Sequence, residues 1–159
     1  MTADQATAGS SDIAIPALLR AARGSYGRAI AARLAGAGFG DLPRNGPFVL
    51  GGMASHGGSA GDMISGLGIS RQAASQLIDT LVLRGYLTRE VNQADRRRMD
   101  IDLTDRGRAA AEVVRAAIDD VDRELAGMIS PVQLAGLRAG LLALAAIREG
   151  TQYGRAAHA

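Results

Sequence analysis

The chain of 159 residues contains no cysteine and no lysine, and its aromatic residues amount to only 3%. The absence of cysteine excludes disulfides, thiolate catalysis and thiolate metal ligands. Only two histidines are present, His56 and His158, so we expect no metal site and no cofactor. With so few aromatic residues, the core is expected to consist of Ala, Leu, Ile, Val and Met.

We also expect no secretory leader, and the sequence contains no long apolar run. The first residues, MTADQATAGSSD, carry neither the basic nor the apolar region of a signal peptide. The longest aliphatic stretch, 141–147, is too short to span a bilayer. We therefore expect a soluble, cytoplasmic protein without a membrane partner. The net charge of +2 is too small to indicate a nucleic-acid partner, so any such argument depends on where the charges lie.

The spacing of apolar residues predicts a mainly α fold with one small β-hairpin, formally α+β. Residues 1–11 are expected to be disordered, and residues 151–159 to form a flexible tail. Caps are expected at Asp12, Ser70, at Thr104 with Asp105, and at Ser130 with Gln133. The expected helices cover 12–36, 48–54, 59–66, 71–84, 104–127 and 131–150, and the expected strands cover 86–91 and 99–103.

A short helix, a tight turn, a second helix and a hairpin together make a winged helix-turn-helix. A helix of this kind can enter the major groove, which is about 12 Å wide, and present polar side chains to base edges. The candidates lie in the first half of helix 71–84: Ser70, Arg71, Gln72, Ser75 and Gln76. The alternative is an ordinary amphipathic helix whose polar face is turned to solvent.

Three consecutive arginines, Arg96, Arg97 and Arg98, lie at the expected tip of the hairpin. A cationic tip is suited to contact with a polyanion, and arginine binds phosphate and guanine in a bidentate manner. The alternative is that these arginines pair with Asp95, Asp100 and Asp102 at the surface, where such pairs contribute little stability.

The run GLGISRQAASQLIDTLVLRGYLTREVNQADRRRMDIDLTDRGRA resembles the MarR family of bacterial transcription regulators, and the resemblance covers residues 12–150. It implies an Asp-x-Arg motif in the wing, which falls on Asp95 and Arg97. In this motif the arginine enters the minor groove and the aspartate orients it. Arg96 and Arg98 are then expected to contact phosphates or neighbouring carboxylates.

The resemblance further implies a homodimer. Residues 12–40 and 104–150 would form the helical dimerisation region, and residues 41–103 the DNA-binding region. Four leucines recur every three or four residues along the expected helix 131–150 and form a leucine seam. The alternative is that this seam packs on the chain's own long helix, 104–127. The expected interface residues are Ile15, Leu18, Leu134, Leu137, Leu141 and Leu144.

Many members of the family bind small aromatic or phenolic acids, and this implies an effector pocket. The alternative is that Tyr26, Phe48 and Met53 belong to the core and that His56 lies in a loop. Glycines crowd residues 51–68, which indicates either close packing or a mobile segment. The candidate pocket residues are Tyr26, Arg28, Phe48, Met53 and His56.

The sequence thus predicts a homodimeric, sequence-specific DNA-binding transcription regulator that recognises a pseudo-palindromic operator in double-stranded DNA. It is expected to be a repressor that a small molecule releases. The alternative is a winged-helix protein that acts through protein contacts, as an antirepressor does. An enzyme is not expected, because no phosphate-binding loop and no Ser/His/Asp set is present.

Overall fold

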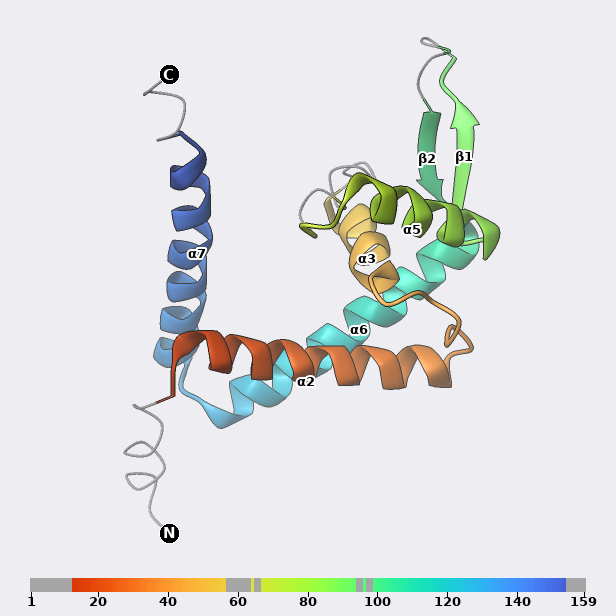
Figure 1. Cartoon of the computed structure of the whole chain (residues 1–159). Coiled ribbons are helices and arrows are strands. Elements are labelled where there is room, and N and C mark those ends of the chain that lie inside the picture. Colours follow the sequence, from red (N-terminus) through yellow and green to blue (C-terminus); the bar gives the residue numbers. More distant parts are fainter. Residues whose placement is uncertain (1–12, 57–63, 65–66, 94–95, 97–98, 154–159) are drawn as a thin grey trace. The chain divides into compact units, whose positions relative to one another are not determined.

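The computed structural model describes residues 13–56, 64, 67–93, 96 and 99–153, without the side chains of residues 56 and 148–153 (Figure 1). It divides into two compact units, residues 1–119 and 120–159, each considered by itself below. The expectations for residues 1–11 and for most of helix 59–66 fall outside the described residues. The elements are α2 (Ile15–Gly36), α3 (Gly46–His56), α5 (Arg71–Leu83), β1 (Leu87–Val91), β2 (Met99–Leu103), α6 (Asp105–Met128) and α7 (Pro131–Tyr153).

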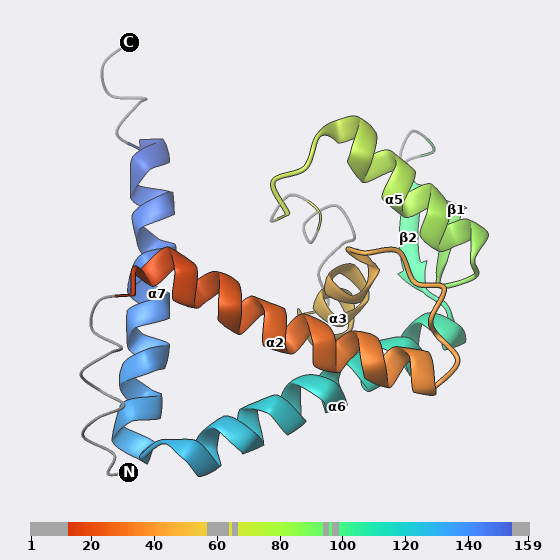
Figure 2. The ribbon, with the colours of Figure 1, turned by 60° about the horizontal axis from the view of Figure 1, so that its bottom comes forward.

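This order confirms the predicted mainly α fold with a single hairpin. In the first unit, α3 lies between α2, α5 and the first half of α6 (Figures 1 and 2). The core is largely aliphatic, as the composition predicts, with Tyr86 as its one fully buried aromatic side chain among the described residues. It joins α2, α3, α5, the root of the hairpin and α6, through Leu34, Val49, Leu50, Met53, Leu77, Leu81, Tyr86, Leu87, Ala110, Ala111 and Val114.

Helix α5 begins and ends where its capping residues predict. The Ser70 hydroxyl accepts a hydrogen bond from the Ala73 N–H at 3.2 Å, which satisfies one of the free donors of the first turn. Gly68 and Gly85 flank the helix with φ values of 64° and 72°, which side chains other than glycine rarely adopt. The apolar face of α5 turns inward, with Leu77 and Leu81 buried.

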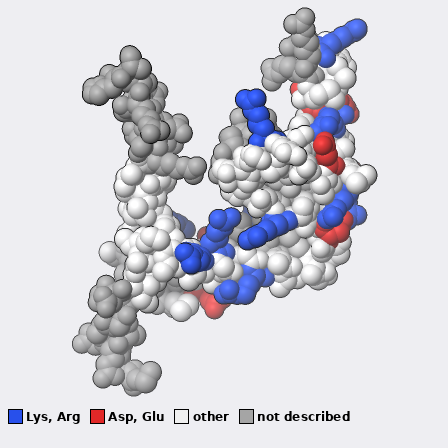
Figure 3. Space-filling view, in the orientation of Figure 1, with Lys and Arg blue, Asp and Glu red and all other residues white. Residues whose placement is uncertain are grey.

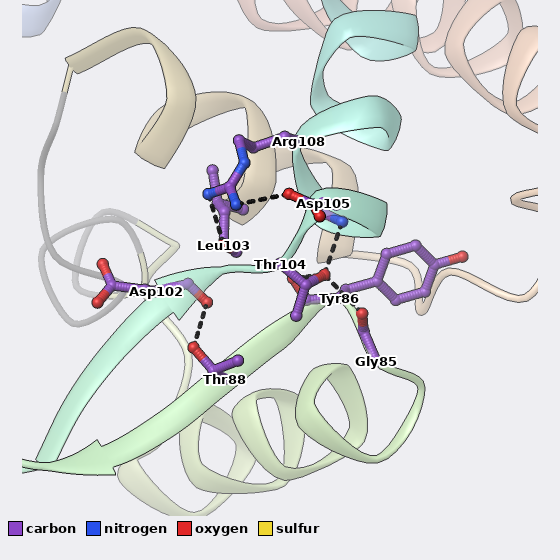
Figure 4. Close-up of polar contacts among 9 residues, drawn as sticks. Gly85, Tyr86, Thr88, Asp102, Leu103, Thr104, Asp105 and Arg108 are labelled. Carbon is purple, nitrogen blue, oxygen red and sulfur yellow. Dashed lines mark hydrogen bonds and ion pairs between the residues drawn. The ribbon is translucent and has the colours of Figure 1, made fainter.

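Strands β1 and β2 pair antiparallel, with Leu87 opposite Leu103 and Val91 opposite Met99. Polar contacts anchor the root of this hairpin to the start of α6 (Figure 4). The Thr104 hydroxyl donates to the Gly85 carbonyl at 2.6 Å and lies 3.1 Å from the Tyr86 carbonyl. The same hydroxyl accepts from the Gly107 N–H at 2.9 Å, so Thr104 caps α6 as predicted.

Three predicted helix ends are wrong. Helix α2 begins at Ile15 with Ala14 as its N-cap, so Asp12 does not cap it. Helix α3 begins at Gly46 rather than at residue 48, following a turn in which the Gly46 N–H donates to the Pro43 carbonyl at 2.7 Å. Helix α7 continues past Gly150 to Tyr153, because one glycine costs a helix only about 1 kcal/mol.

Gly51 of α3 lies beside α6. A Cβ on Gly51 would lie 3.4 Å from Cγ1 of Val114, which is an ordinary van der Waals contact, so close packing does not require glycine at this position. Of the other glycines between residues 51 and 68, Gly57, Gly58, Gly61 and Gly66 lie outside the described residues.

The second unit contains the end of α6 and helix α7. Ser130 and Gln133 form the predicted capping box: the Ser130 N–H donates to Oε1 of Gln133 at 2.9 Å, and the Gln133 N–H donates to Oγ of Ser130 at 3.3 Å. Within the described part of the chain, no helix is long and apolar enough to cross a membrane.

Gly107 is the position at which substitution should harm this fold most clearly. A Cβ on Gly107 would lie 2.1 Å from the Tyr86 carbonyl oxygen, which is backbone and cannot turn aside. We expect Gly107→Ala to lower the free energy of unfolding by about 1–3 kcal/mol, as overpacking does elsewhere. Urea denaturation followed by circular dichroism measures this change.

Gly127→Ala in the same helix is the matched control, because no atom of the described residues outside this helix's own backbone lies within 4 Å of a Cβ there. This variant should be unchanged or stabilised by up to about 1 kcal/mol. Equal stability of the two variants would show that the contact between Gly107 and Tyr86 does not constrain the fold.

Candidate nucleic-acid interface

Four of the five residues predicted to read bases form one exposed surface on the first half of α5: Arg71, Gln72, Ser75 and Gln76. The fifth, Ser70, is also exposed, but its hydroxyl oxygen already accepts the capping hydrogen bond. Basic side chains stand over the start of α5 and over the far end of the hairpin (Figure 3). The structure therefore gathers the predicted recognition residues on one side of one helix.

The tip of the hairpin carries the exposed side chain of Arg96, whereas Asp95, Arg97 and Arg98 lie outside the described residues. Among the residues that the structure describes, Arg96 forms no ion pair with Asp100 or Asp102. Asp100 instead accepts two hydrogen bonds from Nδ2 of Asn92, at 3.1 and 2.9 Å. For Arg96, the alternative of pairing with Asp100 or Asp102 is not observed, and Asp95 lies outside the described residues.

An ion pair that the sequence did not reveal ties the wing to the recognition helix. Nη2 of Arg89 on β1 lies 2.8 Å from Oδ1 of Asp79 on α5. The exposed fractions are 35% and 57%, so the pair contributes little to global stability. Its position matters more, because it joins the two elements that would touch DNA.

A second polar cluster, which we call the Tyr86 cluster, comprises Tyr86, Asp41 and Arg106. The Tyr86 hydroxyl donates to Oδ1 of Asp41 at 2.5 Å, and Nη2 of Arg106 lies 3.0 Å from the same oxygen. The Arg106 guanidinium also lies over the Tyr86 ring, 4.6 Å from its centre, in cation–π geometry. The cluster connects the loop after α2, the root of the wing and the start of α6.

The pKa values in the Tyr86 cluster move in the directions that keep both charges. The hydrogen bond from Tyr86 lowers the pKa of Asp41, against a smaller opposing effect of burial. Burial raises the pKa of Tyr86, and its hydrogen bond to Asp41 adds to that effect. The hydrogen bond to Tyr86 raises the pKa of Arg106. At neutral pH the phenol is therefore a donor to an ionised carboxylate.

The predicted effector residues do not meet at one cavity among the described residues. Met53 is buried in the core, as the alternative held, but Phe48 is 53% exposed. Tyr26 is half-buried and Arg28 is exposed, and the side chain of His56 is not described. A shallow cavity of about 250 Å³, largely open to solvent, lies elsewhere, between α5 and the loop before α3. It is lined by Pro43, Arg44, Asn45, Ile69, Ala73, Gln76, Leu77 and Thr80.

The residues predicted for a dimer interface carry apolar side chains that this chain leaves uncovered. On α2, Ile15 and Leu18 are 58% and 43% exposed. On α7, Leu137, Leu141 and Leu144 are each more than 40% exposed, and Leu134 is half-buried. Exposed leucines that recur every three or four residues are typical of a helix that packs against a partner.

The hairpin beside a capped helix with an exposed polar surface defines a winged helix-turn-helix protein. The model of the MarR family matches residues 41–98, a segment that includes α5 and β1 and ends just before β2. No curated protein shows significant similarity to the sequence.

Solved structures share the fold over most of the chain. S. aureus MepR in its DNA complex is 20% identical, with a TM-score of 0.70 over 85% of this chain and 98% of that one. Wild-type MarR from E. coli, in its apo form, is 21% identical, with a TM-score of 0.61 over 83% of this chain and 97% of that one. The central segment of the chain therefore matches the MarR family, and the chain shares its winged-helix fold with MepR and MarR.

The lowered pKa of Asp41 leads to a pH-dependent prediction. A carboxyl whose pKa is lower in the folded protein stabilises the fold above its ordinary pKa of 3.8, and this contribution is lost as pH falls through the lowered value. We expect Asp41→Asn to melt at a lower temperature than the wild type at pH 7. The difference between their Tm values should shrink below pH 3.8.

Asp119→Asn is the control, because Asp119 is exposed on α6 and forms no ion pair within the described part of the chain. Its Tm should follow that of the wild type at every pH. A Tm difference for Asp41→Asn that did not change with pH would contradict a role for the Asp41 charge.

Proposed function

We propose that this protein is a homodimeric regulator that binds a pseudo-palindromic DNA operator through α5 and the hairpin, and that it acts as a repressor in the cytoplasm. The observation that carries the proposal is the exposed row of Arg71, Gln72, Ser75 and Gln76 on a helix that is capped at its start and braced by the wing. Gln can form two hydrogen bonds with adenine, and Arg with guanine, in the major groove.

The wing would supply a second contact. A hairpin beside a recognition helix can place its tip in the adjacent minor groove, where an arginine meets an enhanced negative potential. Arg96 is exposed at this tip, and we assign Arg97 the groove contact, with Asp95 orienting it. The ion pair between Arg89 and Asp79 supports this arrangement, since it fixes β1 against α5.

Dimerisation through α2 and α7 would place two such surfaces on one duplex. Two recognition helices related by a two-fold axis read half-sites about one helical turn apart. The support is the exposed apolar surface of α7, which includes Leu137, Leu141 and Leu144. A bound dimer would prevent polymerase from reaching the promoter.

Release by a small effector is the regulatory part of the proposal. The cavity beside α5 supports it, because Gln76 lines this cavity and also belongs to the proposed base-reading surface. A small aromatic acid that occupied the cavity would compete with DNA for Gln76, or would favour a dimer geometry that does not fit the operator. Arg44 at the same cavity offers a positive charge to a carboxylate.

The base-reading surface is tested with two DNA duplexes: one selected from a random library by binding to the wild-type protein, and one of the same composition with its sequence shuffled. We expect Gln76→Ala to reduce the preference for the selected duplex by about 1–3 kcal/mol. Arg97→Ala should weaken binding to the selected duplex by a similar amount and lower the salt dependence by about one charge. Fluorescence anisotropy at several salt concentrations measures both effects.

Arg115→Ala removes an exposed arginine of α6, outside the proposed surface, and serves as the control. It should bind both duplexes nearly as the wild type does. A wild-type protein with no preference for any selected duplex would instead favour the protein-contact alternative.

The proposed dimer interface leads to a separate prediction. Leu141→Asp would place a charge within the apolar surface of α7, so we expect the dimer to dissociate into monomers. Leu142→Asp is the matched control. Leu142 is 72% exposed and lies on the same helix, but it does not belong to the row of predicted interface leucines. Light scattering coupled to size exclusion measures the mass. A Leu141→Asp protein that stays dimeric would exclude this surface.

A further inference from the structure

The two faces of the wing differ sharply in chemistry. The register of the hairpin places Leu87, Arg89 and Val91 on one side with their partners Leu103, Ile101 and Met99. Leu87 is buried, and Ile101 and Leu103 pack against the core, so this is the inner face. The opposite side, the outer face, consists of Thr88, Glu90, Asp100 and Asp102, all of which are exposed.

Among the described residues of the two strands, the outer face carries three carboxylates and no basic side chain. Glu90 lies directly opposite Asp100 in the register, and Asp102 is the next residue on the same side of β2. Like charges directly opposite each other destabilise a hairpin. Within the described part of the chain, neither Glu90 nor Asp102 forms an ion pair. The opposed pair Glu90–Asp100 therefore disfavours the hairpin, and among the described residues only Asp100 has a compensating contact, from Asn92.

The neighbouring charges behave differently. Arg89 on the inner face is paired with Asp79, and Arg108 at the start of α6 is paired with Asp105 at 2.8 Å. Arg96 at the tip forms no ion pair with Asp100 or Asp102. In its described part, the wing thus has an exposed arginine, Arg96, at its tip and only acidic charges on its outer face.

We propose that Glu90 and Asp102, with Asp100 beside them, are specificity-determining residues: they repel DNA phosphates from the outer face, so that the wing engages DNA through its arginine tip alone. This inference rests on the proposed DNA-binding function. Binding through phosphates alone is independent of sequence and can occur in many orientations. Carboxylates on one face of the wing penalise the orientations in which that face meets the backbone. Because Arg89 of the inner face pairs with Asp79 on α5, the outer face is turned away from the recognition helix, and we expect it to lie away from the phosphates when α5 reads bases.

The test neutralises the outer face with Glu90→Gln/Asp102→Asn and measures affinity for the selected and the shuffled duplex. Removing two negative charges that lie about 10 Å from several phosphates should raise the DNA affinity roughly threefold to tenfold at about 0.01 M salt, where the Debye length is about 30 Å. We expect the shuffled duplex to be bound tighter by this factor and the selected duplex by less. The gain should shrink at about 0.15 M salt, where the Debye length is about 8 Å.

The matched control is Glu112→Gln/Asp119→Asn on α6. It makes the same two chemical changes at exposed carboxylates that form no ion pair within the described residues. The control variant changes the net charge by the same amount, but at residues of α6 rather than of the wing. It should therefore change the affinity for the shuffled duplex much less. Melting curves check folding: the outer-face variant should be at least as stable as the wild type, because like-charge repulsion is relieved.

Two results would overturn the inference while leaving the proposed function intact. One is an outer-face variant that binds the shuffled duplex no more tightly than the control variant does. The other is an equal gain on both duplexes, which would mean that the carboxylates lower affinity without discriminating between sequences. If the wild-type protein binds neither duplex at the lowest salt concentration, the proposed function itself fails, and this inference fails with it.

Discussion

The first unit depends on one close contact, where the start of α6 meets the junction between α5 and β1. Gly107 approaches the Tyr86 carbonyl so closely that a methyl group cannot fit, and the Thr104 hydroxyl links the two segments through Gly85 and Gly107. The recognition helix and the wing are therefore fixed to α6 at the same point. Because packed junctions of this kind do not deform gradually, a shift of the first half of α6 would carry both elements with it.

The Tyr86 cluster extends this junction to the loop after α2. A fully buried phenol needs a partner for its hydroxyl, and Asp41 supplies one from a distant part of the sequence. Arg106 then neutralises the carboxylate and covers the ring. One buried side chain thus connects the region proposed to dimerise with the region proposed to read DNA. A regulator that changes its operator affinity needs a physical connection of this kind.

Interactions between residues close in the sequence could be predicted here, and those between distant residues could not. Ser70, Gly85, Thr104 and the pair Ser130–Gln133 act within a few residues, so their roles could be predicted from local patterns. The start of α3 and the course of α7 past Gly150 could not, because weak local preferences decided them. The Tyr86 cluster and the pair Arg89–Asp79 join separate elements, so no local pattern indicates them. The exposed row on α5 was predicted because amphipathic periodicity alone fixes which face is polar.

The charge distribution explains how a chain with 18 arginines and 16 acidic residues can be suited to DNA at a net charge of only +2. A high net charge raises affinity for every sequence alike, through counterion release, and so gives no discrimination. Here the positive charge at the wing tip is separated from the negative outer face within a single hairpin. On the proposed arrangement, attraction would be strongest in the orientation that aligns α5 with the major groove. In such a protein, the preference for one DNA sequence over others comes from two sources: the bases that it contacts and the restriction of the orientations in which it can bind the duplex.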